Sequence, residues 1–189
     1  MTQARRSAPA QPALPLRTDR LILREFDADD LPALSEMVGD ARVRENAPGE
    51  SRALATARRA SLGSARRRAG LIRHFELAVT TRRTAKLVGA CDIAFVGPRS
   101  ADIGYLIAPR HWGYGYGTEV AKALVAFGFE QLNIERLAAV VAVDNERSRR
   151  VLAKAGFQWE GLMRRHVRVA GRSWDCHLYA IDRPRWLTL

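Results

Sequence analysis

Three glycines alternate within the segment ADIGYLIAPRHWGYGYGTEV, which covers residues 101–120. Gly113, Gly115 and Gly117 stand between a strand-like run and the expected start of a helix near residues 117–118. Glycine has no Cβ, so closely spaced glycines allow backbone N–H groups to turn toward a ligand. The first turn of a helix adds unpaired N–H donors and the positive end of the helix dipole. The segment therefore predicts a cradle for an anion such as a pyrophosphate.

Two common phosphate-binding loops do not describe this segment. A dinucleotide-binding loop has the spacing G-x-G-x-x-G and lies within a βαβ unit, whereas here the third spacing is missing and the preceding strands are predicted to be antiparallel. A P-loop requires Gly-Lys-Ser/Thr after its first glycine, and these glycines are followed by Thr118 and Glu119 without a lysine.

The eight residues 112–119 (WGYGYGTE) instead resemble the coenzyme-A pyrophosphate loop of GNAT acetyltransferases, in the form typical of the RimJ/RimL-type branch. Further motifs of that branch occur in the right order: TDRLILR at 18–24, DIGY at 102–105, and Asn145-x-x-Ser148 followed by Gly156-Phe157 and Glu160-Gly161. The resemblance covers roughly residues 16–183. The family's loop pattern fits residues 110–115 literally, but we favour residues 112–117 because that register sets Gly117 against the helix start.

The resemblance implies a mixed α/β GNAT fold. Its central sheet would be mostly antiparallel, with about seven strands and one splayed parallel pair, flanked by about four helices. The splayed strands would be residues 102–108 and 136–143, with the pantetheine arm of acetyl-CoA between them and no metal required. The residues expected to contact acetyl-CoA are Ile107, Ala108, Trp112, Gly113, Tyr114, Gly115, Tyr116, Gly117, Thr118, Asn145 and Ser148.

In this family an amine attacks the thioester directly, so a base and an acid are expected to assist. Many members supply the acid as a tyrosine, but this chain has Leu152 at that position, which cannot donate a proton. Ser148 lies one helical turn earlier on the same face and is the predicted catalytic replacement. Its alternative role is helix capping, which is also the alternative for Asn145. Asp102 is the predicted base, unless it is only a charge at the edge of a strand.

Other polar residues have simpler roles. Glu119 is expected to stabilise the start of the helix through the helix dipole. His111 and His166 are expected to be structural or exposed. The weaker candidates for the base are Glu25, Asp92 and Glu160.

Sequence periodicity predicts the elements that must position these residues. The predicted strands are 20–25, 74–80, 86–96, 102–108, 136–143, 158–169 and 173–182. The predicted helices are one capped from residues 27–30 and running through Met37, one over 50–70, one over 118–132 and one over 145–155. Arginines cluster in the segment 50–70, where a solvated helix face is the simplest interpretation.

The composition indicates a single domain over residues 16–189 after a disordered leader over 1–15. The net charge of +11, with only three lysines among the 31 basic residues, favours anionic partners. Cys91 and Cys176 lie far apart and are expected to be buried, reduced thiols. No apolar run is long enough to cross a membrane and no secretory signal is apparent, so we expect a cytoplasmic protein.

These observations predict an enzyme that acetylates a primary amine, on a protein N-terminus, a small amine or an amino acid. Two alternatives stay open: a non-catalytic regulatory module that binds coenzyme A, and an RNA- or ribosome-surface binder that uses the arginines of 50–70. Nucleic acid is the less favoured partner because no RNA-binding strand with alternating basic and aromatic residues is recognisable. The sequence does not distinguish a monomer from a homodimer.

Overall fold

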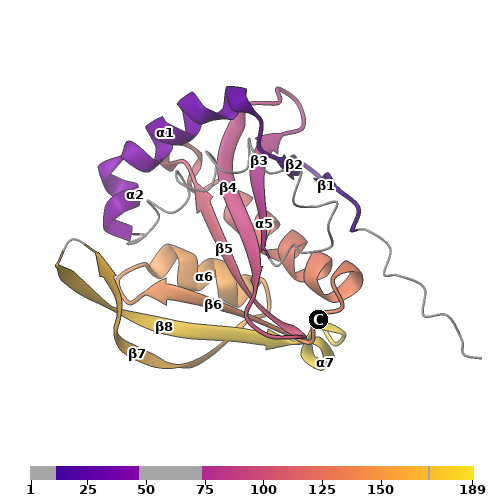
Figure 1. The fold of residues 1–189 in the computed structure, drawn as a ribbon, viewed down its shortest axis with the longest axis vertical. Coiled ribbons are helices and arrows are strands. Elements are labelled where there is room, and N and C mark those ends of the chain that lie inside the picture. Colours follow the sequence, from indigo (N-terminus) through magenta and orange to yellow (C-terminus); the bar gives the residue numbers. More distant parts are fainter. Residues whose placement is uncertain (1–11, 47–73, 170) are drawn as a thin grey trace, which may run out of the picture.

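The computed structural model describes residues 12–46, 74–169 and 171–189. These residues form one eight-stranded sheet with the strand order β1-β2-β3-β4-β5-β6-β8-β7 (Figure 1). The strands are β1 (Leu16–Arg17), β2 (Leu21–Glu25), β3 (His74–Thr81), β4 (Leu87–Phe95), β5 (Ser100–Ile107), β6 (Arg136–Ala142), β7 (Gln158–Val169) and β8 (Arg172–Asp182). The α-helices are α1 (Leu31–Gly39), α2 (Ala41–Asn46), α5 (Tyr116–Ala126), α6 (Glu146–Lys154) and α7 (Arg183–Trp186).

The predicted fold class is confirmed. All neighbouring strands pair antiparallel except β5 and β6, and the short β1 adds one strand to the seven predicted. The helix predicted over 118–132 begins two residues earlier, at Tyr116, and continues beyond Ala126 as a π-helical turn, Phe127–Gln131. The predicted helix over 50–70 and its arginine cluster lie outside the described residues.

The parallel pair β5–β6 separates after only three residue pairs. Its register runs from Ser100–Arg136 to Asp102–Ala138 and then ends. Beyond that point β5 stays paired with β4 as far as Ile107, and β6 stays paired with β8 as far as Ala142. In the described part of the chain no strand pairs with the facing inner edges of β5 and β6, which diverge in Figure 1.

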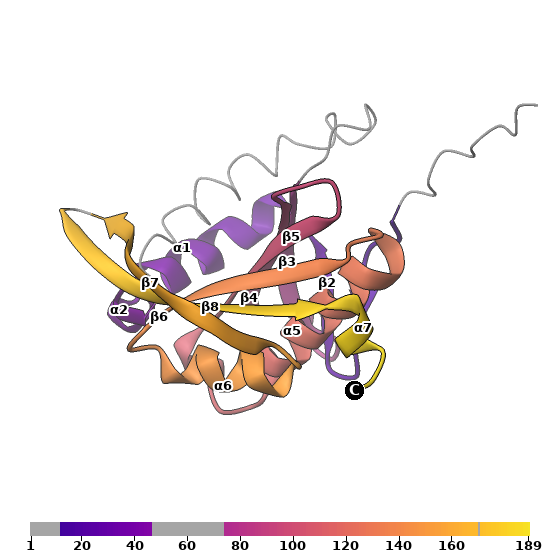
Figure 2. The same ribbon diagram turned by 90° about the horizontal axis from the view of Figure 1, so that it is seen from below.

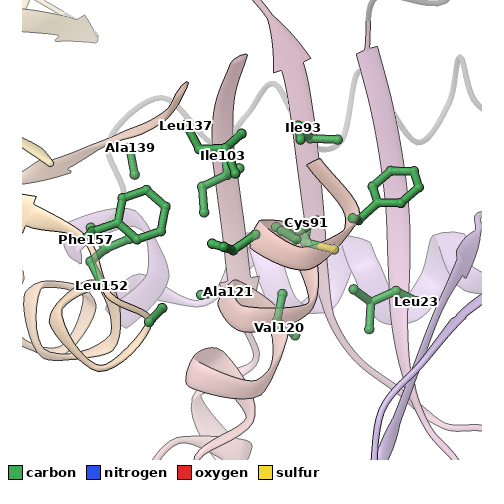
Figure 3. Close-up of a cluster of buried hydrophobic side chains, with 14 of the residues drawn as sticks. Leu23, Cys91, Ile93, Ile103, Val120, Ala121, Leu137, Ala139, Leu152 and Phe157 are labelled. Atoms are coloured by element: carbon green, nitrogen blue, oxygen red, sulfur yellow. The ribbon is translucent and has the colours of Figure 1, made fainter. Parts of the chain in front are cut away.

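Helices cover both faces of the sheet (Figure 2). On one face, α5 buries Val120, Ala121 and Leu124, at the helical spacing that places them against the strands. These side chains join the larger core cluster, which also includes Ile93, Leu137 and Phe157 (Figure 3). On the opposite face, α1 packs a smaller cluster against β3, β4 and β5, with Leu34, Met37, Ala90 and Leu106 among its members.

Both cysteines are buried free thiols, as predicted from their positions in strands. Within the described ranges, no helix is both long enough and apolar enough to pass through a bilayer.

The packing of α5 makes a testable prediction. Leu124 is fully buried, so Leu124→Ala should lower the free energy of unfolding by about 2–5 kcal/mol, because it removes apolar contacts and leaves a cavity. Leu187→Ala removes the same atoms from a side chain that is 70% exposed and should cost less than about 0.5 kcal/mol. Chemical denaturation of both variants measures the difference; equal losses would contradict the assignment of α5 to the core.

Candidate functional site

A cavity of about 630 Å³ follows the gap between β5 and β6. Its walls come from the inner edges of both strands, from the glycine-rich loop before α5 and from one side of α6. Ten of the predicted site residues line it: Asp102, Ile107, Trp112, Gly113, Gly115, Tyr116, Gly117, Thr118, Asn145 and Ser148. The divergence of two strands has therefore brought together residues from three separate stretches of the chain.

Two predicted contact residues turn their side chains elsewhere. Ala108 is buried in the smaller core cluster, on the face of the sheet that α1 covers. Tyr114 is 62% exposed and stacks on Tyr116 with ring centroids 6.0 Å apart. The structure therefore does not bring these two side chains into the cavity.

The glycine-rich loop ends at the N-terminus of α5. Gly115 is the N-cap residue, and both Gly113 (φ +85°) and Gly115 (φ +81°) adopt the left-handed conformation that glycine tolerates best. No side chain caps the helix, so its first N–H groups have no side-chain acceptor. The helix α5 starts at Tyr116, one residue before the expected start near residues 117–118. Gly117 instead allows close packing, since a Cβ there would lie 3.3 Å from Val151 on α6.

Trp112 holds the start of the loop in place. Its indole Nε1 donates a hydrogen bond to the carbonyl oxygen of Ile107 at the end of β5, over 2.7 Å. The guanidinium of Arg147 in α6 lies 4.5 Å from the centre of the Trp112 ring, which is a cation–π contact. One side chain thus ties the loop to both walls of the cavity.

Positive charge gathers where the cavity passes α6. Arg147, Arg150 and Lys154 all line it from successive turns of that helix. His111 lines it too, and burial, with Arg110 nearby, lowers the pKa of His111, which favours its neutral imidazole. An uncapped helix start, left-handed glycines and basic side chains together fit the diphosphate and pantetheine of a coenzyme-A thioester.

The start of α6 confirms the capping role of Asn145. The Asn145 Oδ1 atom accepts a hydrogen bond from the backbone N–H of Ser148 at 3.0 Å. The carbonyl oxygen of Ser148 accepts a hydrogen bond from the Tyr105 hydroxyl at 3.2 Å. Both Ser148 and Tyr105 line the cavity. Leu152, one turn later, is 1% exposed and belongs to the core. Tyr105 was not predicted from the sequence to line the cavity, although strand alternation places it on the same side of β5 as Ile107.

Asp102 lies where β5 and β6 begin to separate. Burial is the main factor that raises the pKa of its carboxyl, the nearby Asp92 raises it further, and His166 acts in the opposite direction. His166 is exposed, as predicted, but it also lines the same cavity from β7. A bulge between Met163 and Val167 interrupts the β7–β8 register next to it, and a bulge of this kind is not readable from the sequence alone.

Two of the weaker acidic candidates, Asp92 and Glu160, are engaged with basic residues and do not line the cavity. Asp92 accepts from His74 at 2.9 Å, and Glu160 forms an ion pair with Arg136. Glu119 is held by Thr18 and Arg20 of the N-terminal segment, a role that goes beyond stabilising its own helix. Among the described residues, no cluster of three or more His, Cys, Asp or Glu side chains has the arrangement of a metal site.

Comparison with known proteins gives the same family as the loop. Residues 20–158 match the family described as the acetyltransferase (GNAT) domain. The uncharacterized N-acetyltransferase YoaA of Bacillus subtilis is 34% identical over 178 residues, which cover 90% of this chain and 97% of YoaA.

Solved structures share the fold over most of its length. RimJ of Mycobacterium smegmatis, in complex with CoA-disulfide, is 28% identical, with a TM-score of 0.73 over 92% of this chain and 89% of that one. A GNAT-family acetyltransferase from Bacillus anthracis is 24% identical, with a TM-score of 0.75 over 89% and 98% of the two chains. Because the family domain spans most of the sequence and YoaA matches it over nearly its full length, the chain belongs to the GNAT family and is an N-acetyltransferase.

Proposed function

We propose that the protein transfers an acetyl group from acetyl-CoA to a primary amine by direct attack within a ternary complex. The observation that carries the proposal is one continuous cavity, which connects the uncapped start of α5 with Asp102 through the gap between β5 and β6. Acetyl-CoA supplies the activated thioester. The chain supplies a binding track and a carboxyl group, both needed to bring an amine to that thioester.

The N-terminus of α5 binds the diphosphate. The N–H groups that follow Gly115 donate to it, and the helix dipole favours its negative charge. The basic side chains of α6 face the same part of the cavity. The inner edges of β5 and β6 then flank the pantetheine arm, whose amides would hydrogen-bond to backbone groups along these edges.

Proton transfer falls to two residues at the cavity wall. Ser148 presents its hydroxyl from α6 and donates a hydrogen bond to the departing sulfur, in place of the tyrosine that this chain lacks. Asp102 accepts a proton from the ammonium group of the acceptor, which frees the neutral amine to attack the thioester; a raised pKa makes a carboxylate a stronger base for this step. Fixing both substrates in line accounts for much of the expected acceleration.

The acceptor is a protein N-terminal amine or a small amine. RimJ of Mycobacterium smegmatis, at 28% identity, supports the RimJ/RimL-type branch. A putative ribosomal-protein-serine acetyltransferase from Vibrio cholerae, 25% identical over 90% of this chain, points in the same direction. Over only 63 residues the chain is also 35% identical to the spermidine N(1)-acetyltransferase of Escherichia coli. A protein N-terminus is therefore the first acceptor to test and a polyamine the second.

Release of free thiol from acetyl-CoA tests the activity directly. The panel includes peptides with a free N-terminus that begin with serine or alanine, the same peptides with a blocked N-terminus, spermidine and free amino acids. We expect turnover with at least one unblocked amine and none with its blocked form. Tight binding of coenzyme A without turnover on any acceptor would instead favour a regulatory module.

The glycine loop gives the first variant. Gly115→Glu should abolish measurable binding of coenzyme A in calorimetry while circular dichroism stays native, because it puts a carboxylate and a strained left-handed residue at the N-cap, beside the N–H groups that would bind the diphosphate. Gly171→Glu is the matched control: Gly171 also has a left-handed backbone, at φ +80°, but lies in the β7–β8 turn with open space around it. Undiminished binding by Gly115→Glu would overturn the assignment of the loop.

Ser148 gives the second variant. If its hydroxyl assists the leaving sulfur, Ser148→Ala should lower kcat by about 100-fold or more and change the KM for acetyl-CoA little. Asn145→Ala is the control for capping, since it removes the observed cap and should mainly lower stability, by about 1 kcal/mol. Wild-type kcat in Ser148→Ala would show that the hydroxyl has no part in the chemistry.

Asp102 makes a prediction that couples activity to stability. Its pKa is raised in the folded protein, so the charged form at neutral pH opposes folding. Asp102→Asn should therefore lose most activity, yet its melting temperature at pH 7 should be higher than that of the wild type. This gain in melting temperature should vanish in acid, because Asp102 is then protonated in both the folded and the unfolded wild type. As the pH falls, kcat/KM of the wild type should begin to decline at a higher pH than it would if the base were an exposed aspartate, because the raised pKa of Asp102 makes it take up its proton sooner. Full activity of Asp102→Asn would exclude it as the base.

A further inference from the structure

Arg20, in the N-terminal segment, is bonded to Glu119 in the first turn of α5, the helix that directly follows the glycine-rich loop. We propose that these two residues form a clamp, in which Glu119 anchors Arg20 and Arg20 holds the loop, so that the clamp sets the shape of the loop and thereby its affinity for the diphosphate. Both are positioning residues. The inference rests on the proposed function, because it concerns the same coenzyme site.

The carboxylate of Glu119 is the anchor. One oxygen, Oε1, accepts hydrogen bonds from the Thr18 hydroxyl at 2.5 Å and from the backbone N–H of Arg20 at 2.9 Å. The other, Oε2, accepts from Arg20 Nε at 2.7 Å. The Glu119 side chain is only 14% exposed, so these contacts replace most of its water. Burial alone would raise the pKa of Glu119, but the hydrogen bonds from Thr18 and Arg20 outweigh it and the pKa is lowered.

The guanidinium of Arg20 reaches three consecutive loop residues. It donates to the carbonyl oxygen of Tyr114 at 2.8 Å and lies 4.9 Å from the ring centre of Tyr116. Between them, a Cβ placed on Gly115 would lie 3.4 Å from the guanidinium. These residues include the N-cap of α5, whose neighbouring N–H groups are the proposed diphosphate donors.

The clamp serves the site in two ways. Because glycine residues can adopt many backbone conformations, the free loop could take many shapes. A fixed Tyr114 carbonyl restricts the loop before the ligand binds. Glu119 also lies in the first turn of α5, where an unpaired carboxylate would repel a diphosphate. Arg20 neutralises that charge and keeps it turned toward β2.

Arginine is required because of its geometry. Its planar group donates in two directions at once, to a carboxylate on one side and to a carbonyl on the other. A lysine would keep the charge but could not hold both the Glu119 carboxylate and the Tyr114 carbonyl in this geometry. The TDRLILR motif, which the proposed chemistry does not otherwise use, thus acquires a role through Thr18 and Arg20.

The test measures the KM of the wild type and of Arg20→Met for two thioesters, acetyl-CoA and S-acetylpantetheine. We expect the KM for acetyl-CoA to rise roughly tenfold, as when a charged hydrogen bond is lost, with kcat at saturation unchanged. S-acetylpantetheine has no diphosphate, so its KM should not change. Glu119→Gln should produce a smaller effect of the same kind, and Arg20→Lys should fall between Arg20→Met and the wild type.

Arg99→Met is the matched control. Arg99 forms an ion pair with Glu135 over 2.5 Å, at an exposure close to that of Arg20, at the far end of β5 from the loop. It should leave both KM values unchanged. Equal increases in KM for the two thioesters in Arg20→Met, or no increase in either, would overturn the clamp.

Direct binding separates this inference from the proposed function. If the wild type turned over no amine, the proposed function would fail, yet calorimetry with coenzyme A and with pantetheine would still test the clamp. Weaker binding of coenzyme A alone in Arg20→Met supports it. A matched loss for both ligands, in step with a lower melting temperature, would show that Arg20 only stabilises the fold.

Discussion

The site depends on the early end of pairing between β5 and β6. Within a continuous sheet, the backbone groups beyond Asp102 and Ala138 would bond to one another and leave no space. Because the two strands diverge, each keeps its outer partner and offers its inner edge to the cavity. A binding track thus arises from backbone geometry, with side chains needed only at its two ends.

The wide end of the gap is shaped for negative charge. The uncapped start of α5 stands beside a helix, α6, that presents three basic side chains to the same cavity. The loop before α5 is held on two sides, by Trp112 from the β5 end and by Arg20 from the residue just before β2. Such a loop pays little ordering entropy when a ligand arrives, which favours binding of a long and flexible molecule.

The narrow end has a different character. Asp102 is half-buried, close to Asp92 and to His166, in a chain whose net charge is +11. A carboxyl with a raised pKa is costly to the fold when it is charged, and the proposed role of Asp102 as the base would account for such a cost. Ser148 faces the same cavity from α6, where Leu152 has become part of the core.

The sequence by itself determined the family, the positions of seven strands along the chain and the glycine-rich loop, because closely spaced glycines and alternating apolar residues leave local signals. Only the tertiary structure decided which residues line the cavity and which side chains contact one another across the fold. Ala108 turned to the opposite face, and Tyr105 and His166 joined the cavity wall. Arg20 and Glu119 are 99 residues apart and form their contact through the packing of α5 against β2. No local pattern encodes such a contact, since it depends on how whole elements pack.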